Sequence, residues 1–244
     1  MCDTMRDSRK LRYYNLREKK PSFFSGWSVT NWLILINVVF FIITFSLMFV
    51  SEKYLSYFAL QPIAFLNGRF WTLLTSMFMH GNFFHLFINM FVLFSLGNLC
   101  EKIIGRKRFL GFYLISGILA GLVFILFAYF FGSSETGSLA ERVFGSPLAY
   151  AVGASGAIFA IAGLFMILTP RLRFMIIFLP FFSLPAYIMI PIVLFVTWIV
   201  SSSVGWGIGN TAHFGGFLAG FFYGLYLRQK YKRKTKMIAE YFSG

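Results

Sequence analysis

Charged residues are scarce in this chain. Asp, Glu, Lys and Arg together make up 12% of its 244 residues, about half of their usual share in a soluble globular domain. Hydrophobic residues account for 58% of the chain, and its mean hydropathy is +0.74. This composition excludes an ordinary soluble domain, so we expect the chain to lie in a lipid bilayer.

Cysteine is also rare, since the chain has only Cys2 and Cys100. Two widely separated cysteines predict neither a disulfide framework nor a Cys-rich metal site. Of the eight acidic residues, none falls between residues 143 and 227. A carboxylate-dependent site in that part of the chain is therefore not expected.

Long stretches without any charged residue indicate the membrane spans. Five such stretches reach or exceed the roughly 20 residues that a spanning helix needs, at 21–51, 70–100, 109–134, 143–170 and 174–227. The last one contains a glycine-rich break at 205–210, which is typical of a short loop between two helices. We therefore predict an all-α polytopic membrane protein with six spans, near 28–50, 83–104, 109–131, 154–169, 185–203 and 211–228.

The basic residues predict the orientation of these spans. Of the 22 Lys and Arg residues, 19 fall in the two terminal segments and in the turns after spans two and four. Positively charged segments stay in the cytoplasm, so we expect both termini there. The net charge of +14 is then explained by topology and anionic headgroups, and not by nucleic acid. We divide the chain into a basic tail (1–26), one membrane domain (27–228) and a second basic tail (229–244).

The connection between spans one and two, residues 51–82, is too rich in aromatic residues for an ordinary aqueous loop. Amphipathic aromatic rings favour the headgroup layer. We expect this segment to lie in the membrane interface.

Polar residues inside spans are costly and point to function. His85 lies 16 residues before the inner charged flank of span two, Ser155 lies 16 before that of span four, and His213 lies 15 before that of span six. At 1.5 Å per residue these separations are roughly 22 to 24 Å, in a hydrocarbon core of about 30 Å. The three side chains are therefore predicted to share one layer.

A serine and a histidine at one depth suggest a nucleophile with its general base. Ser155 begins a helix between Gly153 and Gly156, where free backbone N–H groups favour an oxyanion. Small residues on span four and the glycines Gly216 and Gly220 on span six favour close packing of these two helices.

Other side chains are candidates to support this pair. His85 and Asn89 are four residues apart on one helix face and are expected to donate hydrogen bonds to an oxyanion. Phe159, one turn after Ser155, is a candidate to stack against the imidazole of His213. His80 precedes the helix, and we expect it to tie the loop to the helix top rather than to take part in chemistry. Without a nearby carboxylate, we predict a dyad.

These motifs together resemble the rhomboid family of intramembrane serine proteases, over roughly residues 29–228. The likeness is carried by the segments Trp71–His80, Gly153–Gly156 and Ala212–Gly216, with His85, Asn89, Met90 and Gly220. The resemblance implies a six-helix rhomboid-like bundle in which Ser155 is the nucleophile and His213 the base. It implies an oxyanion hole formed by His85, Asn89 and the Ser155 N–H, with His80 structural, and no metal, nucleotide or other cofactor.

The resemblance also implies the substrates, which are expected to be membrane proteins with a single span, cut near the non-cytoplasmic side. We expect a multi-pass protein of the plasma membrane of a prokaryote. Two positions depart from the family pattern. Thr72 stands where Arg is frequent, which leaves Arg69 as a candidate to anchor the loop, and Phe159 stands where many members have Tyr.

Three other functions are compatible with parts of this pattern. A catalytically inactive relative that binds membrane clients is the main alternative, although Ser155 and His213 are both retained. A metal or haem protein would use the three histidines, but it leaves Asn89 and the Gly-Ala-Ser-Gly helix start unexplained. A transporter usually needs charged residues within its spans, and the predicted spans have almost none.

Overall fold

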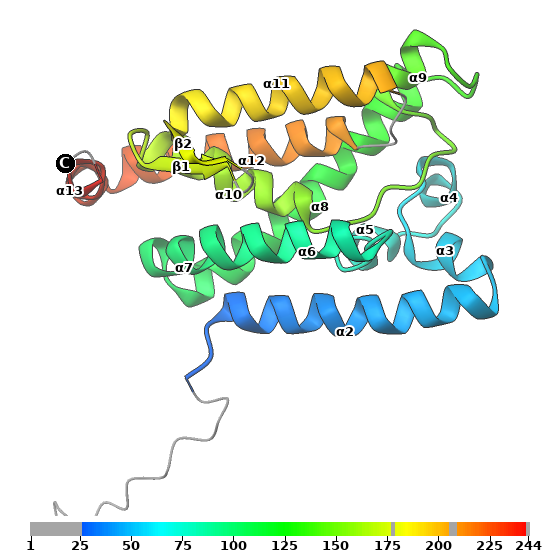
Figure 1. The fold of residues 1–244 in the computed structure, drawn as a ribbon, viewed down its shortest axis with the longest axis horizontal. Coiled ribbons are helices and arrows are strands. Elements are labelled where there is room, and N and C mark those ends of the chain that lie inside the picture. Colours follow the sequence, from blue (N-terminus) through cyan, green and yellow to red (C-terminus); the bar gives the residue numbers. More distant parts are fainter. Residues whose placement is uncertain (1–25, 177–178, 205–208, 243–244) are drawn as a thin grey trace, which may run out of the picture.

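The computed structural model describes residues 26–176, 179–204 and 209–242, and most of them are helical. Helices occupy all six predicted spans, and they lie roughly alongside one another with α2 on one flank and α11 on the other (Figure 1). They are α2 (Val29–Val50), the continuous run of α6 (Phe83–Val92), η1 (Leu93–Gly97) and α7 (Asn98–Ile104), then α8 (Arg106–Phe130), α10 (Ser155–Leu168), α11 (Ala186–Val204) and α12 (Asn210–Lys230). The predicted polytopic helical fold is confirmed.

The helices differ in length and in burial. Among the described residues, four helical runs are long and apolar enough to cross a membrane, at 29–50, 83–104, 106–130 and 186–203. The buried helix α10 has 14 residues, which gives it a length of about 21 Å. That is shorter than a hydrocarbon core of about 30 Å. The segment before Ser155 must therefore enter the bundle to reach the start of α10.

The non-helical segment before Ser155 has backbone partners inside the protein. Leu60 and Ala151 exchange two backbone hydrogen bonds of 3.0 and 2.8 Å, and the Gly153 N–H donates to the Ser76 carbonyl at 2.8 Å. Irregular backbone within a membrane protein is tolerated where the protein satisfies it in this way. The predicted interfacial connection at 51–82 thus supplies partners for the segment that leads to α10.

Within that connection the chain forms three short helices, α3 (Lys53–Phe58), α4 (Pro62–Leu66) and α5 (Thr72–Thr75). The Arg69 guanidinium donates to the Ser56 carbonyl at 2.7 Å, and the Trp71 indole donates to the Tyr57 carbonyl at 2.9 Å. Arg69 therefore anchors the loop in this chain, as its proximity to Thr72 suggested.

Direct backbone contact joins α10 to α12. A Cβ atom added at Gly216 would lie 2.0 Å from the Gly156 carbonyl oxygen, and one added at Gly220 would lie 1.8 Å from the Ala160 carbonyl oxygen. No side chain larger than hydrogen fits these two positions without moving a helix. The close packing expected from the small residues is present, and it fixes α12 against the buried helix α10.

A buried carboxylate joins span two to α2. Glu101, 6% exposed, accepts from the Val29 and Thr30 N–H groups at 2.9 Å and from the Thr30 hydroxyl at 3.0 Å. Arg106 lies 3.5 Å from the same carboxylate. The negative charge caps the N-terminus of α2, where the helix dipole stabilises it.

Two strands and two helices outside the predicted spans were not expected from the sequence. Strands β1 (Arg173–Ile176) and β2 (Leu179–Pro185) pair antiparallel before α11. Helix α9 (Leu139–Phe144) lies in the connection after α8, and helix α13 (Lys232–Tyr241) lies within the segment predicted to be a basic tail. The described part of the chain is therefore helical, with one antiparallel pair of short strands.

Candidate functional site

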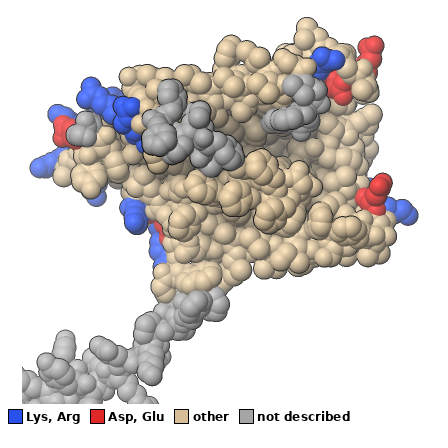
Figure 2. Space-filling model, viewed as in Figure 1, with Lys and Arg blue, Asp and Glu red and all other residues tan. Residues whose placement is uncertain are grey.

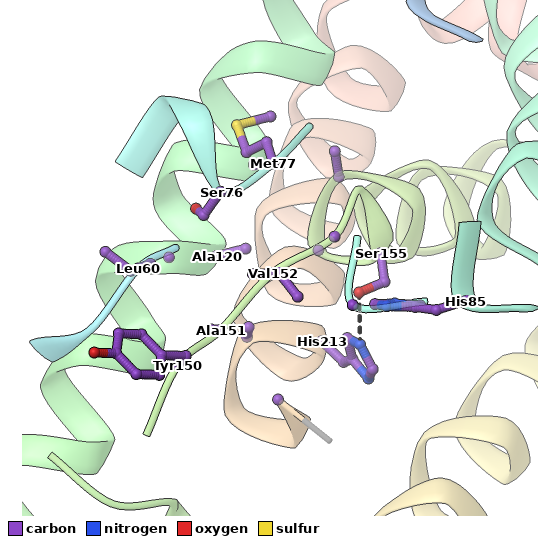
Figure 3. Close-up of a pocket in the computed structure, with 18 of the residues that line it drawn as sticks. Leu60, Ser76, Met77, His85, Ala120, Tyr150, Ala151, Val152, Ser155 and His213 are labelled. Carbon is purple, nitrogen blue, oxygen red and sulfur yellow. Dashed lines mark hydrogen bonds between the residues drawn. The ribbon is translucent and has the colours of Figure 1, made fainter. Parts of the chain in front are cut away.

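Ser155 and His213 meet at the contact between α10 and α12. The serine is the first residue of α10, and His213 lies in the first turn of α12. The His213 Nε2 atom is 2.8 Å from the Ser155 hydroxyl oxygen (Figure 3). The two residues are 58 positions apart in the chain, so their contact depends on the glycine packing of the two helices.

The imidazole of His213 is held by an aromatic ring. The Phe159 ring stacks on it with centroids 4.5 Å apart and planes 26° from parallel. When the Ser155 hydroxyl donates to Nε2, the ring proton must lie on Nδ1. Among the described residues the buried Nδ1 atom has no hydrogen-bond partner. Stacking by Phe159, as the sequence suggested, therefore orients the ring in the part of the site that the structure describes.

His85 and Asn89 border the segment that leads to Ser155. A Cβ atom added at Gly153 would lie 3.0 Å from His85 Nε2 and 3.7 Å from Asn89 Nδ2. Gly153 also has a φ of +120°, which residues with side chains rarely adopt. The glycine therefore serves two purposes, since it permits the turn and leaves space beside both nitrogen atoms.

Asn89 also makes a local bond, since its side-chain amide donates to the His85 carbonyl at 3.0 Å. This bond uses one of its two amide hydrogens and holds the side chain on the same helix face as His85. The other hydrogen remains for a ligand.

His80 is fully buried outside the helices, and its Nδ1 atom lies 3.2 Å from the Phe78 carbonyl oxygen. Its ring packs edge-on against His85 with centroids 5.1 Å apart. The pKa of His80 is lowered to about 4, mainly because the ring is buried and to a smaller extent because His85 lies nearby. A neutral, buried His80 that bonds to a loop carbonyl fits the structural placement expected from the sequence.

Asn82 and Ser76 are two further residues at the site to which the sequence analysis assigned no role. The Asn82 side chain caps α6 by accepting from the His85 N–H at 2.8 Å, and the Ser76 carbonyl accepts from Gly153. An asparagine just before an apolar helical run is a usual N-cap signal, so Asn82 could have been found. The Ser76 contact has no signal in the sequence, because it joins segments that are distant in the chain.

A cavity of about 320 Å³ opens beside Ser155 and His213. Figure 3 shows Ser155, His85 and His213 close together, with Met77, Ala120 and Leu60 further along the same cavity. None of its lining residues is acidic. The lining is largely apolar and has small residues beyond the serine, so the cavity can accept an extended peptide with a small side chain next to the reacting atom.

The remaining candidate residues lie as follows. Gly156, Gly216 and Gly220 form the contact between α10 and α12 and do not border the nitrogen atoms of the site. In the described part of the chain, no group of three His, Cys, Asp or Glu side chains is arranged to hold a metal ion. The arrangement places a serine hydroxyl beside an imidazole nitrogen, with N–H donors nearby, and such a set can support acyl transfer.

Comparison with known proteins identifies the region that contains this site. Residues 67–230 match the Rhomboid domain. The chain is similar to RHOMBOID-like protein 5 from Arabidopsis thaliana, with 34% identity over 169 residues. The matched region is 68% of this chain and 47% of the plant protein, so the chain matches about half the length of that relative.

Proposed function

Because the chain belongs to the rhomboid family, with a Rhomboid domain over two thirds of its length, we propose that it is an intramembrane serine endopeptidase. The observation that carries the proposal is the 2.8 Å contact between Ser155 and His213 in a bundle of apolar helices. A histidine within hydrogen-bond reach of a serine is the arrangement that activates the hydroxyl as a nucleophile.

In this mechanism the Ser155 oxygen attacks the carbonyl carbon of the scissile peptide bond while Nε2 of His213 accepts the hydroxyl proton. The tetrahedral intermediate collapses, His213 gives the proton to the leaving amine, and an acyl-enzyme remains on Ser155. A water molecule then repeats the same steps and releases the acid. Phe159 keeps the imidazole plane in place throughout.

The negative oxygen of the tetrahedral intermediate is stabilised by the His85 ring, the Asn89 amide and the Ser155 N–H. The first two border the free space beside Gly153. The third has no backbone partner among the described residues, because Ser155 begins α10. Loss of one such donor typically lowers the rate about 10²- to 10³-fold.

The proposed substrates are spanning segments of other membrane proteins. They fit the apolar cavity and the small residues that line it. We further propose that both termini are cytoplasmic, because most of the basic residues gather at one end of the bundle. The plasma membrane of a prokaryote stays a prediction, and the plant relative gives it no support.

The test uses the full chain purified in detergent, a fluorophosphonate probe and a model substrate with one membrane span. The wild type is expected to cleave the substrate and to bind the probe covalently, and Ser155→Ala is expected to do neither. Ser133→Ala, a substitution in the connection after α8, is the matched control and should behave as wild type. Absence of both cleavage and Ser155-dependent labelling in the wild type contradicts the proposal.

The alternative is a protein that binds membrane clients without cutting them. The plant relative is named "RHOMBOID-like", and this name states no protease activity. The alternative predicts that the wild type retains the model substrate in a pull-down without cutting it. Labelling of Ser155 together with cleavage would exclude it.

A further inference from the structure

Most of the described basic residues of the bundle gather at one end (Figure 2). In the described part of the chain, twelve Lys and Arg residues follow the helix ends at 102–108, 171–173 and 228–236. The described carboxylates nearby are Glu101, which is buried against α2, and Glu240, which pairs with Lys236 at 3.8 Å. The surface at this end therefore carries a strong excess of positive charge.

Two of these cations converge on one aromatic ring where α8, α12 and α13 meet. The Arg108 guanidinium carbon lies 5.5 Å from the centre of the Tyr231 ring, and the Lys230 ammonium lies 5.7 Å from the same centre. Arg108 also donates to the Tyr231 hydroxyl at 3.4 Å. Lys230 donates to the Tyr226 hydroxyl at 2.6 Å. The tyrosines thus hold both cations in defined positions.

Neither cation has a carboxylate partner among the described residues. Both side chains are exposed, and Tyr226 is about half exposed. Two like charges beside one ring repel each other, and an anion that contacts both would remove that repulsion. The tyrosine hydroxyls and the two cations together offer several hydrogen-bond donors to such an anion.

The position of this cluster in the bundle indicates where the anion comes from. It lies at the ends of two helices that run through the apolar bundle, so it reaches the level at which the chain leaves the hydrocarbon. Tyrosine is favoured at that level, and the phosphate groups of lipids lie there. We propose that Arg108, Lys230, Tyr226 and Tyr231 form a binding site for the phosphate of an anionic phospholipid headgroup.

The experiment measures retention of lipid by the full chain in detergent micelles, with phosphatidylglycerol as the anionic probe and phosphatidylcholine as the neutral one. The double variant Arg108→Gln/Lys230→Gln removes the site. A matched control, Arg171→Gln/Lys234→Gln, removes the same charge at the same end without touching the two tyrosines. A third variant, Arg108→Lys/Lys230→Arg, keeps both charges.

A cation that contacts the bound phosphate is expected to contribute roughly a fivefold factor to anionic lipid affinity, and a cation elsewhere on the same surface much less, because solvent and salt screen it. The Gln pair is therefore expected to lose about thirtyfold in phosphatidylglycerol affinity, and the control pair less than about threefold. The charge-preserving variant should stay within about threefold of wild type, because both positive charges remain beside the tyrosines. A Gln pair that still binds phosphatidylcholine as the wild type does is folded, so its loss of phosphatidylglycerol affinity is due to the site. Phosphatidylcholine binding should not change in any variant.

Three results would overturn the proposal. Equal losses in the two Gln pairs would mean that only diffuse surface charge attracts the lipid. No preference of the wild type for phosphatidylglycerol over phosphatidylcholine would exclude a site for anionic lipid. Complete competition by inorganic phosphate at a concentration equal to that of the lipid would assign the site to free phosphate.

Discussion

Gly220 is the position where a single added methyl group should most directly disable the site. In Gly220→Ala the new Cβ would lie 1.8 Å from the Ala160 carbonyl oxygen, and Cβ atoms essentially never come closer than 3.0 Å to such a neighbour. To relieve the contact, α12 must move away from α10 by about 1.2 Å. The 2.8 Å contact between Ser155 and His213 would then lengthen towards about 4 Å, beyond hydrogen-bond reach.

A displacement of about 1 Å at reacting groups can cost roughly 10²-fold in rate. We therefore expect Gly220→Ala to lower both substrate cleavage and fluorophosphonate labelling of Ser155 about a hundredfold. Gly111→Ala on α8 is the control, because no atom lies within 4 Å of its added Cβ. Circular dichroism checks that both variants remain helical. If Gly220→Ala keeps its activity within threefold of wild type, glycine packing does not set the distance between the serine and the histidine.

Three further predictions follow from contacts described above. Glu101→Gln should lower the free energy of unfolding in detergent by about 3 kcal/mol, because it replaces a buried carboxylate that accepts three hydrogen bonds. The control Glu240→Gln, at an exposed carboxylate, should change the free energy of unfolding by less than about 0.5 kcal/mol. Equal effects of the two substitutions would refute the capping role of Glu101. Phe159→Leu should lower kcat about three- to tenfold through loss of the ring stack on His213, whereas Phe159→Tyr should keep most of it. The pKa of His80 is lowered from 6.5 to about 4, so His80 takes up a proton in the unfolded chain at a higher pH than in the folded one. The wild type should therefore lose about 2 kcal/mol of stability from this group between neutral pH and pH 5. Thermal unfolding measured over this pH range checks the prediction, and the same pH dependence in His80→Gln would contradict it.

The spans and the contact between Ser155 and His213 could be predicted because their signals are local. An apolar run of about 20 residues must be a helix in a bilayer, so the positions of α2, α8 and α11 follow from composition. Ser155 and His213 could be paired because polar residues are rare in such runs and their depths can be counted from the charged flanks. The 2.8 Å contact agrees with that pairing.

The rest depends on contacts that no local pattern encodes. The Ser76 carbonyl holds Gly153 across 77 residues of sequence, and the bond of Glu101 to Thr30 joins residues 71 positions apart. The pairing of β1 with β2 was missed because residues 174–184 are a nearly continuous apolar run without the alternating pattern of a half-buried strand, and the sequence predicts no element there before the span at 185–203. Helix α13 was missed because its basic composition predicted a solvated tail.

Span two contains the five-residue π-helical segment η1 at Leu93–Gly97. A π turn adds one residue to the helix, which changes the angular phase of everything after it by roughly 100°. His85 and Asn89, before the turn, face Gly153 in the segment that leads to α10, whereas Asn98 and Glu101, after it, bond to the start of α2. A single continuous span can therefore contact two neighbouring segments that lie in different directions. The extra residue of η1 sets the angle between the helix face that borders Gly153 and the face that binds α2.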